Sequence, residues 1–399
     1  MTSVRFLNGL NTLGGNIVEI ATATSRVITD FGLATTAPAA GGSAANPLPN
    51  LPELFADTAD AFTDEAIVIT HWHHGHMDAL RYLQKAVPIY LSPASMRLYA
   101  ALVALGQQKP LANVHPLPLT IPLAIGDLSV TGFASDHDEP GAMAVLIDDG
   151  DHAYLTSGDV RLNDAHQTAV AKWCQAVKKR HVKMLFLDCT AFANEMPPAG
   201  AAPTLLNEAD LQAAIADCLA ASSQLVAVDC DQRNWQRLAA LQTTAHRHHR
   251  QVAWPPATAQ LLAQVAHITP DGPIRLAQLR AQPNRYVVAT TPATVGALAD
   301  LPVDLYCHVT TETAAVFPPL CAKLQPLVRT FAVASHATAP DVIRLCQMVA
   351  PDIVVPWHCL APDRAAAALD AHTKAAVLLP EKELYYTVDA EENGDEPGM

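Results

Sequence analysis

A dense histidine cluster directly after a hydrophobic segment is the feature that most restricts what this chain can fold into. Residues 66–70 (AIVIT) have the composition of a short buried strand, and they run straight into the sequence HWHHGHMD. Four histidines therefore lie within the six positions 71–76. Residues 77–85 are predicted to form a helix. The cluster is expected at the carboxyl end of a strand, where α/β sheets place their ligand-binding residues.

Length and composition indicate a compact globular protein. The chain has 399 residues, half of them hydrophobic and only 16% charged, which is enough for one large or two ordinary domains. The formal net charge is −14. This acidic balance opposes the broad electrostatic attraction of nonspecific nucleic-acid binders, so a polyanionic substrate would need a local basic or metal-bearing cleft.

Missing sequence patterns predict the cellular compartment of the protein and the state of its cysteines. Residues 1–13 have no signal-peptide pattern, and no stretch has the roughly 18 apolar residues of a membrane span. We therefore expect a cytoplasmic protein without membrane contact. The eight cysteines form no CxxC pair and are expected to be buried thiols.

The order of strand-like and helix-like patterns predicts an α/β protein with an insertion. The first part reads as a β-meander followed by further strands, at 4–7, 16–20, 26–31, 89–91, 128–133, 142–147, 153–155 and 184–187. Helices at 208–221 and 232–246 then alternate with strands at 225–228 and 286–289. A segment at 331–334, a helix at 340–349 and a strand at 353–355 return to the style of the first part. We expect one domain formed by 1–200 and 326–388, an α/β insertion at 201–325, and a frayed acidic tail at 389–399.

The histidine density points to metal rather than to packing. Zinc takes neutral imidazole nitrogens at about 2.0–2.1 Å, and residues that alternate at a strand end can converge on one point. The alternative is a polar histidine-rich loop without metal, because short motifs give false matches. The remaining histidines and aspartates decide between these interpretations.

The cluster resembles the H-x-H-x-D-H signature of the metallo-β-lactamase fold, a superfamily of mainly two-metal hydrolases. Three further elements of that family follow in order, DHDEPG at 136–141, TSGD at 156–159 and VPWH at 355–358. The resemblance implies a four-layer αββα sandwich. It also implies zinc, one or two ions per chain, with manganese as the alternative metal. The implied ligands are His71, His73 and His137 for the first metal, His76 and His358 for the second, and Asp159 as a bridge.

The insertion extends the resemblance to the β-CASP nucleases of this superfamily, especially those of the ribonuclease J type. LDCT at 187–190 and SHA at 335–337 are similar to two motifs of that group. The resemblance implies that Asp188 orients a ligand or passes a proton and that His336 stabilises or protonates the phosphate or leaving oxygen. For Asp188 the alternative is a turn carboxylate at a strand end.

One residue departs from the signature. Gly75 stands where the motif has aspartate, a ligand of the second metal in the family. The second site would then be weaker or empty, with Asp78 as a candidate replacement one helical turn later. His74 is expected to point away from the metals because side chains alternate there.

We therefore expect a metal-dependent hydrolase that acts on phosphodiester bonds, with RNA as its substrate. One alternative is a small-molecule ester, lactone or amide hydrolase of the same fold. Another is a catalytically degenerate homologue that binds RNA or a protein partner without cleaving it. A homodimer is left open.

Overall fold

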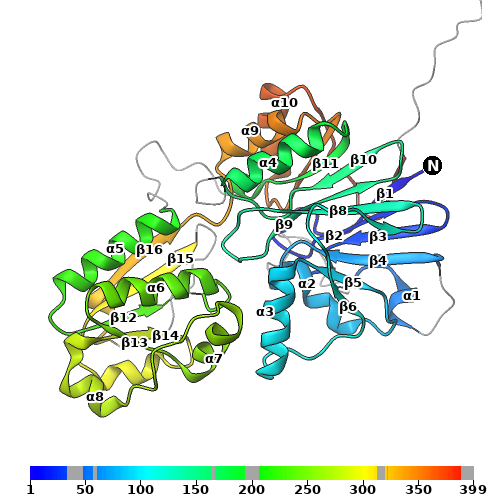
Figure 1. Cartoon of the computed structure of the whole chain (residues 1–399). Helices are drawn as coiled ribbons and strands as arrows, with labels where there is room; N and C mark the ends of the chain where they lie inside the picture. Colours follow the sequence, from blue (N-terminus) through cyan, green and yellow to red (C-terminus); the bar gives the residue numbers. More distant parts are fainter. Residues whose placement is uncertain are drawn as a thin grey trace, which may run out of the picture.

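The computed structural model describes residues 1–33, 48–56, 61–162, 167–193, 206–229, 231–311, 320 and 322–387, which form three β-sheets flanked by helices (Figure 1). The expected boundary at 200/201 and the tail at 389–399 lie outside these residues.

The first sheet has seven strands in the order β19-β1-β2-β3-β4-β5-β6. Its strands are β1 (Ser3–Asn8), β2 (Ile17–Ala21), β3 (Ser25–Thr29), β4 (Asp64–Ile69), β5 (Ile89–Leu91), β6 (Val114–Pro116) and β19 (Tyr385–Thr387). Strands β1, β2 and β3 pair antiparallel, as the predicted meander requires, and β3 to β6 pair parallel. Every residue of β2 and β3 is buried, as expected for strands covered on both faces.

The second sheet also has seven strands, in the order β18-β17-β11-β10-β9-β8-β7. Its strands are β7 (Leu123–Ile125), β8 (Leu128–Ala134), β9 (Met143–Asp148), β10 (Ala153–Thr156), β11 (Val182–Asp188), β17 (Ile353–Trp357) and β18 (Ala376–Val377). Strand β17, although far along the chain, pairs parallel with β11. This pairing places the last predicted ligand segment beside the earlier ones.

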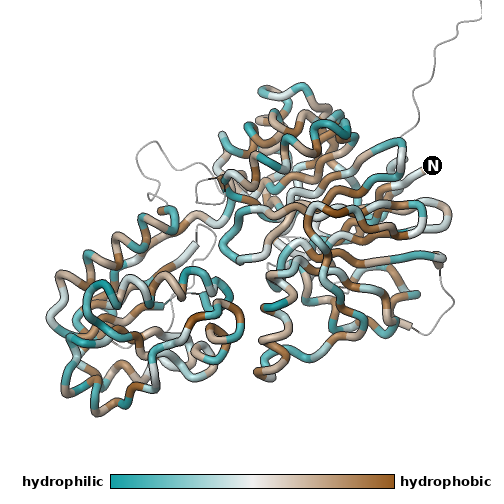
Figure 2. The backbone as a smooth tube through the Cα atoms, viewed as in Figure 1, coloured by the Kyte–Doolittle hydropathy of each residue, from teal (hydrophilic) through white to brown (hydrophobic). Residues whose placement is uncertain are grey.

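The two sheets pack face to face through a core that includes Phe6, Val145, Phe186 and Trp357. Helices α1 (Pro52–Phe55) and α3 (Pro93–Ala104) cover the first sheet, and helices α4 (Gln167–Lys178), α9 (Ala339–Val349) and α10 (Pro362–His372) cover the second. The strands between these helices are mostly hydrophobic (Figure 2). The architecture is therefore a four-layer αββα sandwich, as expected.

Residues from α5 to β16 form a separate α/β unit inserted between β11 and α9 (Figure 1). Its five-stranded sheet is all parallel, in the order β13-β14-β12-β15-β16. The strands are β12 (Leu225–Asp229), β13 (Gln251–Ala253), β14 (Tyr286–Thr290), β15 (Val303–Thr311) and β16 (Val328–Val333). The helices are α5 (Glu208–Ala221), α6 (Trp235–Arg247), α7 (Pro256–Val265) and α8 (Leu276–Ala281), with 3₁₀ helices η3 (Pro283–Arg285), η4 (Val295–Asp300) and η5 (Gln325–Leu327).

Two details of the predicted organisation are wrong. Strand β16 pairs with β15, so the sheet of the insertion continues to Val333, past the expected boundary at 325. The helix expected at 77–85 begins earlier, as α2 (His74–Met77), and continues as the 3₁₀ helix η1 (Asp78–Tyr82). Two such short pieces contain too few turns for a helical periodicity to be recognised.

The insertion contacts the sandwich on the side of the histidine cluster. Leu261 and Val265 of α7 pack into the same core as Leu98 and Leu102 of α3. Arg233, which follows the carboxyl end of β12, donates to the carbonyl oxygen of Trp72 at 2.6 Å. The chain leaving the carboxyl end of β16 leads directly to His336. The carboxyl edge of the insertion's sheet therefore faces the cluster.

Two remaining expectations concern the membrane and the cysteines. None of the helices in the described ranges is long and apolar enough to cross a bilayer. Six cysteines in those ranges are buried and form no disulfide. Cys230 and Cys321 lie outside them.

Candidate metal centre

The predicted site residues lie at the ends of strands and are close to one another. His71 and His73 follow β4, His137 follows β8, and Asp159 follows β10. Asp188 is the last residue of β11, and His358 follows β17 directly. In the described residues, three groups could each hold a metal ion, with one ligand atom per residue and all atoms within 4.8 Å: His71, His73 and His137; His71, His76 and Asp159; and Asp159, Asp188, His336 and His358.

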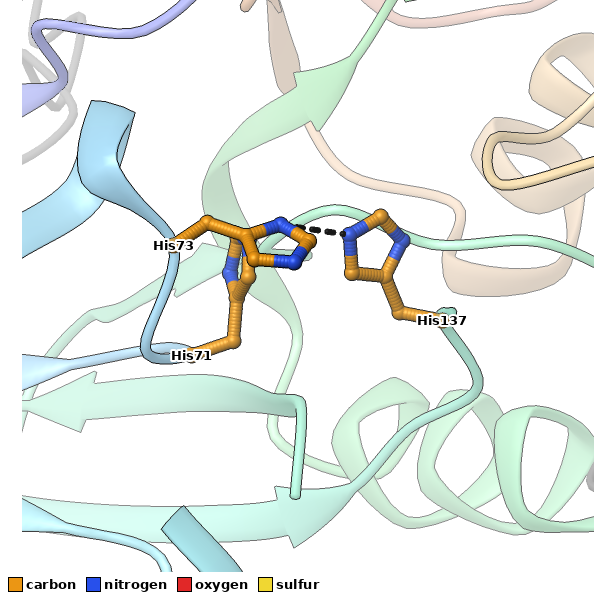
Figure 3. Close-up of side chains that lie close together, drawn as sticks. All are labelled: His71, His73 and His137. Carbon is orange, nitrogen blue, oxygen red and sulfur yellow. Dashed lines mark hydrogen bonds between the residues drawn. The ribbon is translucent and has the colours of Figure 1, made fainter. Parts of the chain in front are cut away.

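The first group consists of three imidazoles that face one another (Figure 3). The His73 Nδ1 and His137 Nε2 atoms lie 3.3 Å apart. Ligands held tetrahedrally at zinc distances are also about 3.3–3.4 Å apart. The fully buried His71 Nε2 atom has no hydrogen-bond partner in the described structure. Converging nitrogens and an orphaned buried nitrogen fit a bound cation.

Burial disfavours protonation of this group. Desolvation lowers the pKa of His137 to about 4 and lowers the pKa of His71 well below its ordinary value, with the neighbouring His76 adding to the effect at His71. Neutral imidazole is the form that binds metal. The site therefore keeps these two rings in their ligating state at neutral pH.

Asp159 lies between the first and second sets of predicted ligands. Its Oδ2 atom is 3.5 Å from His71 Nε2, 3.3 Å from His76 Nε2 and 3.9 Å from His137 Nε2. Its Oδ1 atom is 3.8 Å from His358 Nδ1. The side chain is buried, which would raise its pKa, but the surrounding histidines, His358 foremost, hold the pKa well below its usual range. The carboxylate thus faces histidines of both sets.

His76 is held by a residue that the sequence did not reveal. Its Nδ1 atom lies 2.8 Å from Asp30 Oδ2, while Asp30 Oδ1 accepts from the backbone of Thr70 at 2.7 Å. Carboxylates that bind the outer nitrogen of an imidazole commonly orient metal ligands. Burial alone would lower the pKa of His76, but Asp159 and Asp30 hold it well above its ordinary value. Asp30 therefore fixes the ring with Nε2 toward Asp159.

Asp188 anchors two histidines on the other side of Asp159. Its Oδ2 atom lies 2.7 Å from His336 Nδ1, and its Oδ1 atom accepts from the Thr190 hydroxyl at 2.7 Å. Thr190 Oγ1 in turn lies 2.8 Å from His358 Nδ1. Burial would raise the pKa of Asp188, but His336 holds it well below its usual range. The His336 ring centroid is 5.2 Å from that of His137 and 5.5 Å from that of His358.

Gly75 leaves the second set without the motif carboxylate. Its carbonyl oxygen accepts hydrogen bonds from Gly15 and Asn16, at 2.8 and 3.2 Å. A Cβ atom on Gly32 would lie 1.6 Å from this oxygen, so only glycine fits at position 32. Asp78 does not take the missing place, because both its oxygens lie 3.0 Å from His74 Nδ1 on the exposed side. His74 points away from the cluster, as expected, and contacts Arg233.

Two further buried carboxylates border the first group. Asp138 Oδ1 is 3.1 Å from His137 Nε2, and Glu139 Oε2 is 3.4 Å from His73 Nε2. Glu139 also accepts from the backbone of Trp72 at 2.5 Å. Both residues follow His137 directly in the DHDEPG segment. Their closeness to His137 in the sequence therefore indicates that they lie at the same site.

A cavity of about 170 Å³ opens beside His358. None of its lining residues is lysine or arginine. They come from the β1–β2 connection and from the segments around β17 and α10. Besides His358, the lining consists of Gly9, Leu10, Asn11, Pro356, Cys359, Pro362, Asp363, Leu379 and Pro380. A group bound there would meet Asn11 and Asp363 rather than a cation.

Comparison with known proteins leaves the family open. No protein-family model matches the chain, and no curated protein matches it. A solved structure of a protein of unknown function from Enterococcus faecalis V583 has a TM-score of 0.78 at 20% identity, covering 97% of this chain and 100% of that one. The two proteins share a fold. The metallo-β-lactamase fold protein YhfI from Bacillus subtilis reaches a TM-score of 0.45 at 10% identity, covering 97% and 100%. A TM-score this low does not establish a common fold.

Proposed function

We propose that this protein is a metal-dependent hydrolase of the metallo-β-lactamase type. The observation that carries the proposal is the convergence of His71, His73 and His137 around one point, with Asp159 between them and a second set containing His76 and His358. The order of these residues along the chain agrees with the family motif, and the αββα sandwich agrees with its fold.

The proposed reaction is the attack of water on a phosphodiester, with RNA as the preferred substrate. Zinc or manganese held by these residues would supply Lewis acidity, lowering the pKa of water and stabilising charge on the phosphate. His336 lies next to both ligand sets and, in its imidazolium form, would donate the Nε2 proton to the leaving oxygen. Asp188 keeps the His336 ring oriented through its Nδ1 atom, so that Nε2 carries out the transfer.

The position of the insertion supports a phosphodiester substrate. Its sheet turns its carboxyl edge toward the histidine cluster, and edges of this kind bind ligands in α/β proteins. Arg233 brings a guanidinium group from this edge to the metal-binding loop. We propose that the insertion is a β-CASP domain and that RNA lies between it and the cluster.

A second candidate is hydrolysis of a small ester, lactone or amide. The cavity beside His358 favours it, because a lining without lysine or arginine suits a neutral or cationic group better than a nucleic-acid backbone. A short substrate could place its scissile bond near His358 and the rest of its structure in this cavity.

The experiment that tests the proposal compares substrates on one metal-loaded preparation. The purified chain is loaded with zinc or manganese and assayed on 5′-monophosphorylated RNA, on bis(p-nitrophenyl) phosphate, and on panels of lactones, esters and amides. We expect cleavage of RNA and of the phosphodiester, abolished by chelator and by His71→Ala. As a control, His248→Ala changes a half-buried histidine of the insertion that belongs to none of the three candidate groups, and it should leave the rates unchanged.

Other outcomes assign the function differently. Turnover of a lactone, ester or amide without phosphodiester cleavage would favour the second candidate. Tight RNA binding without turnover of any substrate would point to a degenerate homologue instead.

A further inference from the structure

Asp138 presents an unpaired carboxylate oxygen to the first group of histidines. The residue is 7% exposed, and within the described part of the chain its Oδ1 atom has no hydrogen-bond partner. This atom lies 3.1 Å from His137 Nε2 and 3.7 Å from His73 Nε2. A buried carboxylate oxygen without a donor is costly, so its surroundings should contain a positive charge that satisfies it.

The hydrogen bonds of His137 show which of its nitrogens carries the proton. Its Nδ1 atom lies 2.8 Å from the carbonyl oxygen of Ser335, which can only accept, so Nδ1 is the donor. In the neutral ring, Nε2 then has a lone pair and no hydrogen. This lone pair faces Asp138 Oδ1, an atom that is also an acceptor.

Glu139 places a second buried oxygen beside the same histidines. Its Oε2 atom lies 3.4 Å from His73 Nε2 and, like Asp138 Oδ1, has no hydrogen-bond partner among the described residues. The two carboxylate oxygens and the lone pair of His137 Nε2 therefore lie close together, an arrangement that repels without a cation and binds strongly with one.

We propose that Asp138 is a direct ligand of the first metal, together with His71, His73 and His137. The inference rests on the metal site of the proposed function and adds a residue that the motif resemblance does not include. It also accounts for Gly75. The second set lacks the carboxylate that the motif has at position 75. Asp138 supplies a carboxylate to the first set instead, so the ligands around the two metals keep the same total negative charge.

Binding of the two metals should therefore differ in strength. The first site has three imidazoles and a carboxylate of its own, besides its share of Asp159. The second has His76, His358 and the shared Asp159. Zinc should bind in two separate steps, the first equivalent tightly and the second weakly.

The test is zinc affinity measured by competition with a chromophoric chelator on the full chain. Asp138→Asn, which keeps the shape and removes the charge, should weaken binding of the first zinc equivalent at least as much as loss of a residue that only orients a ligand, which costs about 10- to 100-fold. Asp78→Asn is the matched control, because Asp78 lies in the same region but bonds to His74 on the exposed side, and it should leave the affinity unchanged. Cobalt substitution should show a changed visible absorption spectrum for Asp138→Asn.

A second readout separates ligation from a structural role. In the chelated protein Asp138→Asn removes repulsion between acceptors, so its unfolding temperature should equal or exceed that of the unaltered chain. Unchanged zinc affinity would overturn the inference, and so would a lowered unfolding temperature of Asp138→Asn in the chelated state, because it would show a structural role. Asp138-dependent zinc binding without hydrolysis of any substrate would leave it standing and remove the proposed function. An unaltered chain that binds no zinc would overturn both.

Discussion

At the scale of single residues, the site is built from imidazole rings with one nitrogen held and the other directed inward. Asp30 holds His76, the Ser335 carbonyl holds His137, Asp188 holds His336 and Thr190 holds His358. Motif order predicts that these histidines and Asp159 lie together, and the structure brings them within reach of one another. Motif order could not predict Asp30, because Asp30 and His76 are 46 residues apart and only the fold brings them together.

These buried rings make stability depend on pH in a defined window. An unfolded histidine takes up a proton near pH 6.5, whereas folded His137 does so only near pH 4. Between these values the unfolded state binds more protons, so stability falls as the pH falls, by up to about 1.4 kcal/mol per pH unit for each such histidine. His71 acts in the same direction. His76, whose pKa is raised, contributes stability that is fully present below pH 6.5 and so adds no slope in this window.

We therefore predict that the unfolding temperature of the chelated protein decreases from pH 6.5 to pH 4.5. His137→Gln, which cannot take up a proton, should decrease less steeply. Equal slopes for the two proteins would show that His137 is protonated in the folded state at these pH values.

At the scale of elements, the strands were predictable and several helices and pairings were not. Buried strands such as β4 and β11 are short hydrophobic runs that stand out in sequence. Strand β16 was assigned to the sandwich because nothing in residues 331–334 says which sheet they join, and only pairing with β15 decides it. Helix α3 begins with a Ser92 cap and Pro93, which are recognisable helix-start signals in the sequence.

Ion pairs connect the elements of the two units. Glu208 at the start of α5 accepts from Arg237 of α6 at 2.7 and 2.9 Å and from Arg161 of the sandwich at 3.3 Å. Burial would raise the pKa of Glu208, but Arg237 and Arg161 lower it. Both arginine side chains are nearly fully buried, and Arg161 also pairs with Asp136 at 2.9 Å, so Glu208 is one of the charges that compensate them.

We predict that Glu208→Gln lowers the free energy of unfolding by about 2–3 kcal/mol, because it removes the carboxylate that faces two buried guanidinium groups. Urea unfolding followed by circular dichroism measures this. The exposed Glu381 provides the control, since Glu381→Gln should change the midpoint little. If Glu208→Gln lowers the free energy of unfolding by less than about 0.5 kcal/mol, the Glu208 ion pairs contribute no more than exposed surface pairs do, and the prediction is wrong.

At the scale of the whole molecule, an αββα sandwich carries the candidate metal ligands and an inserted α/β unit faces them. The sandwich fixes the histidines through strand ends from both sheets, and the insertion reaches the same loop through Arg233. The architecture of the sandwich was predictable from motif order. The contact between α7 and α3 was not, because it depends on how two separately folded units pack.

The central claim is that a metal ion binds between the histidines that follow β4 and β8. Diffraction data collected at the zinc absorption edge from crystals of the zinc-loaded protein test it most directly. We predict a strong anomalous peak bounded by His71 Nε2, His73 Nδ1, His137 Nε2 and Asp138 Oδ1, and a weaker one near His76 and His358. An anomalous map with zinc only on the surface, and none at this cluster, would contradict the claim.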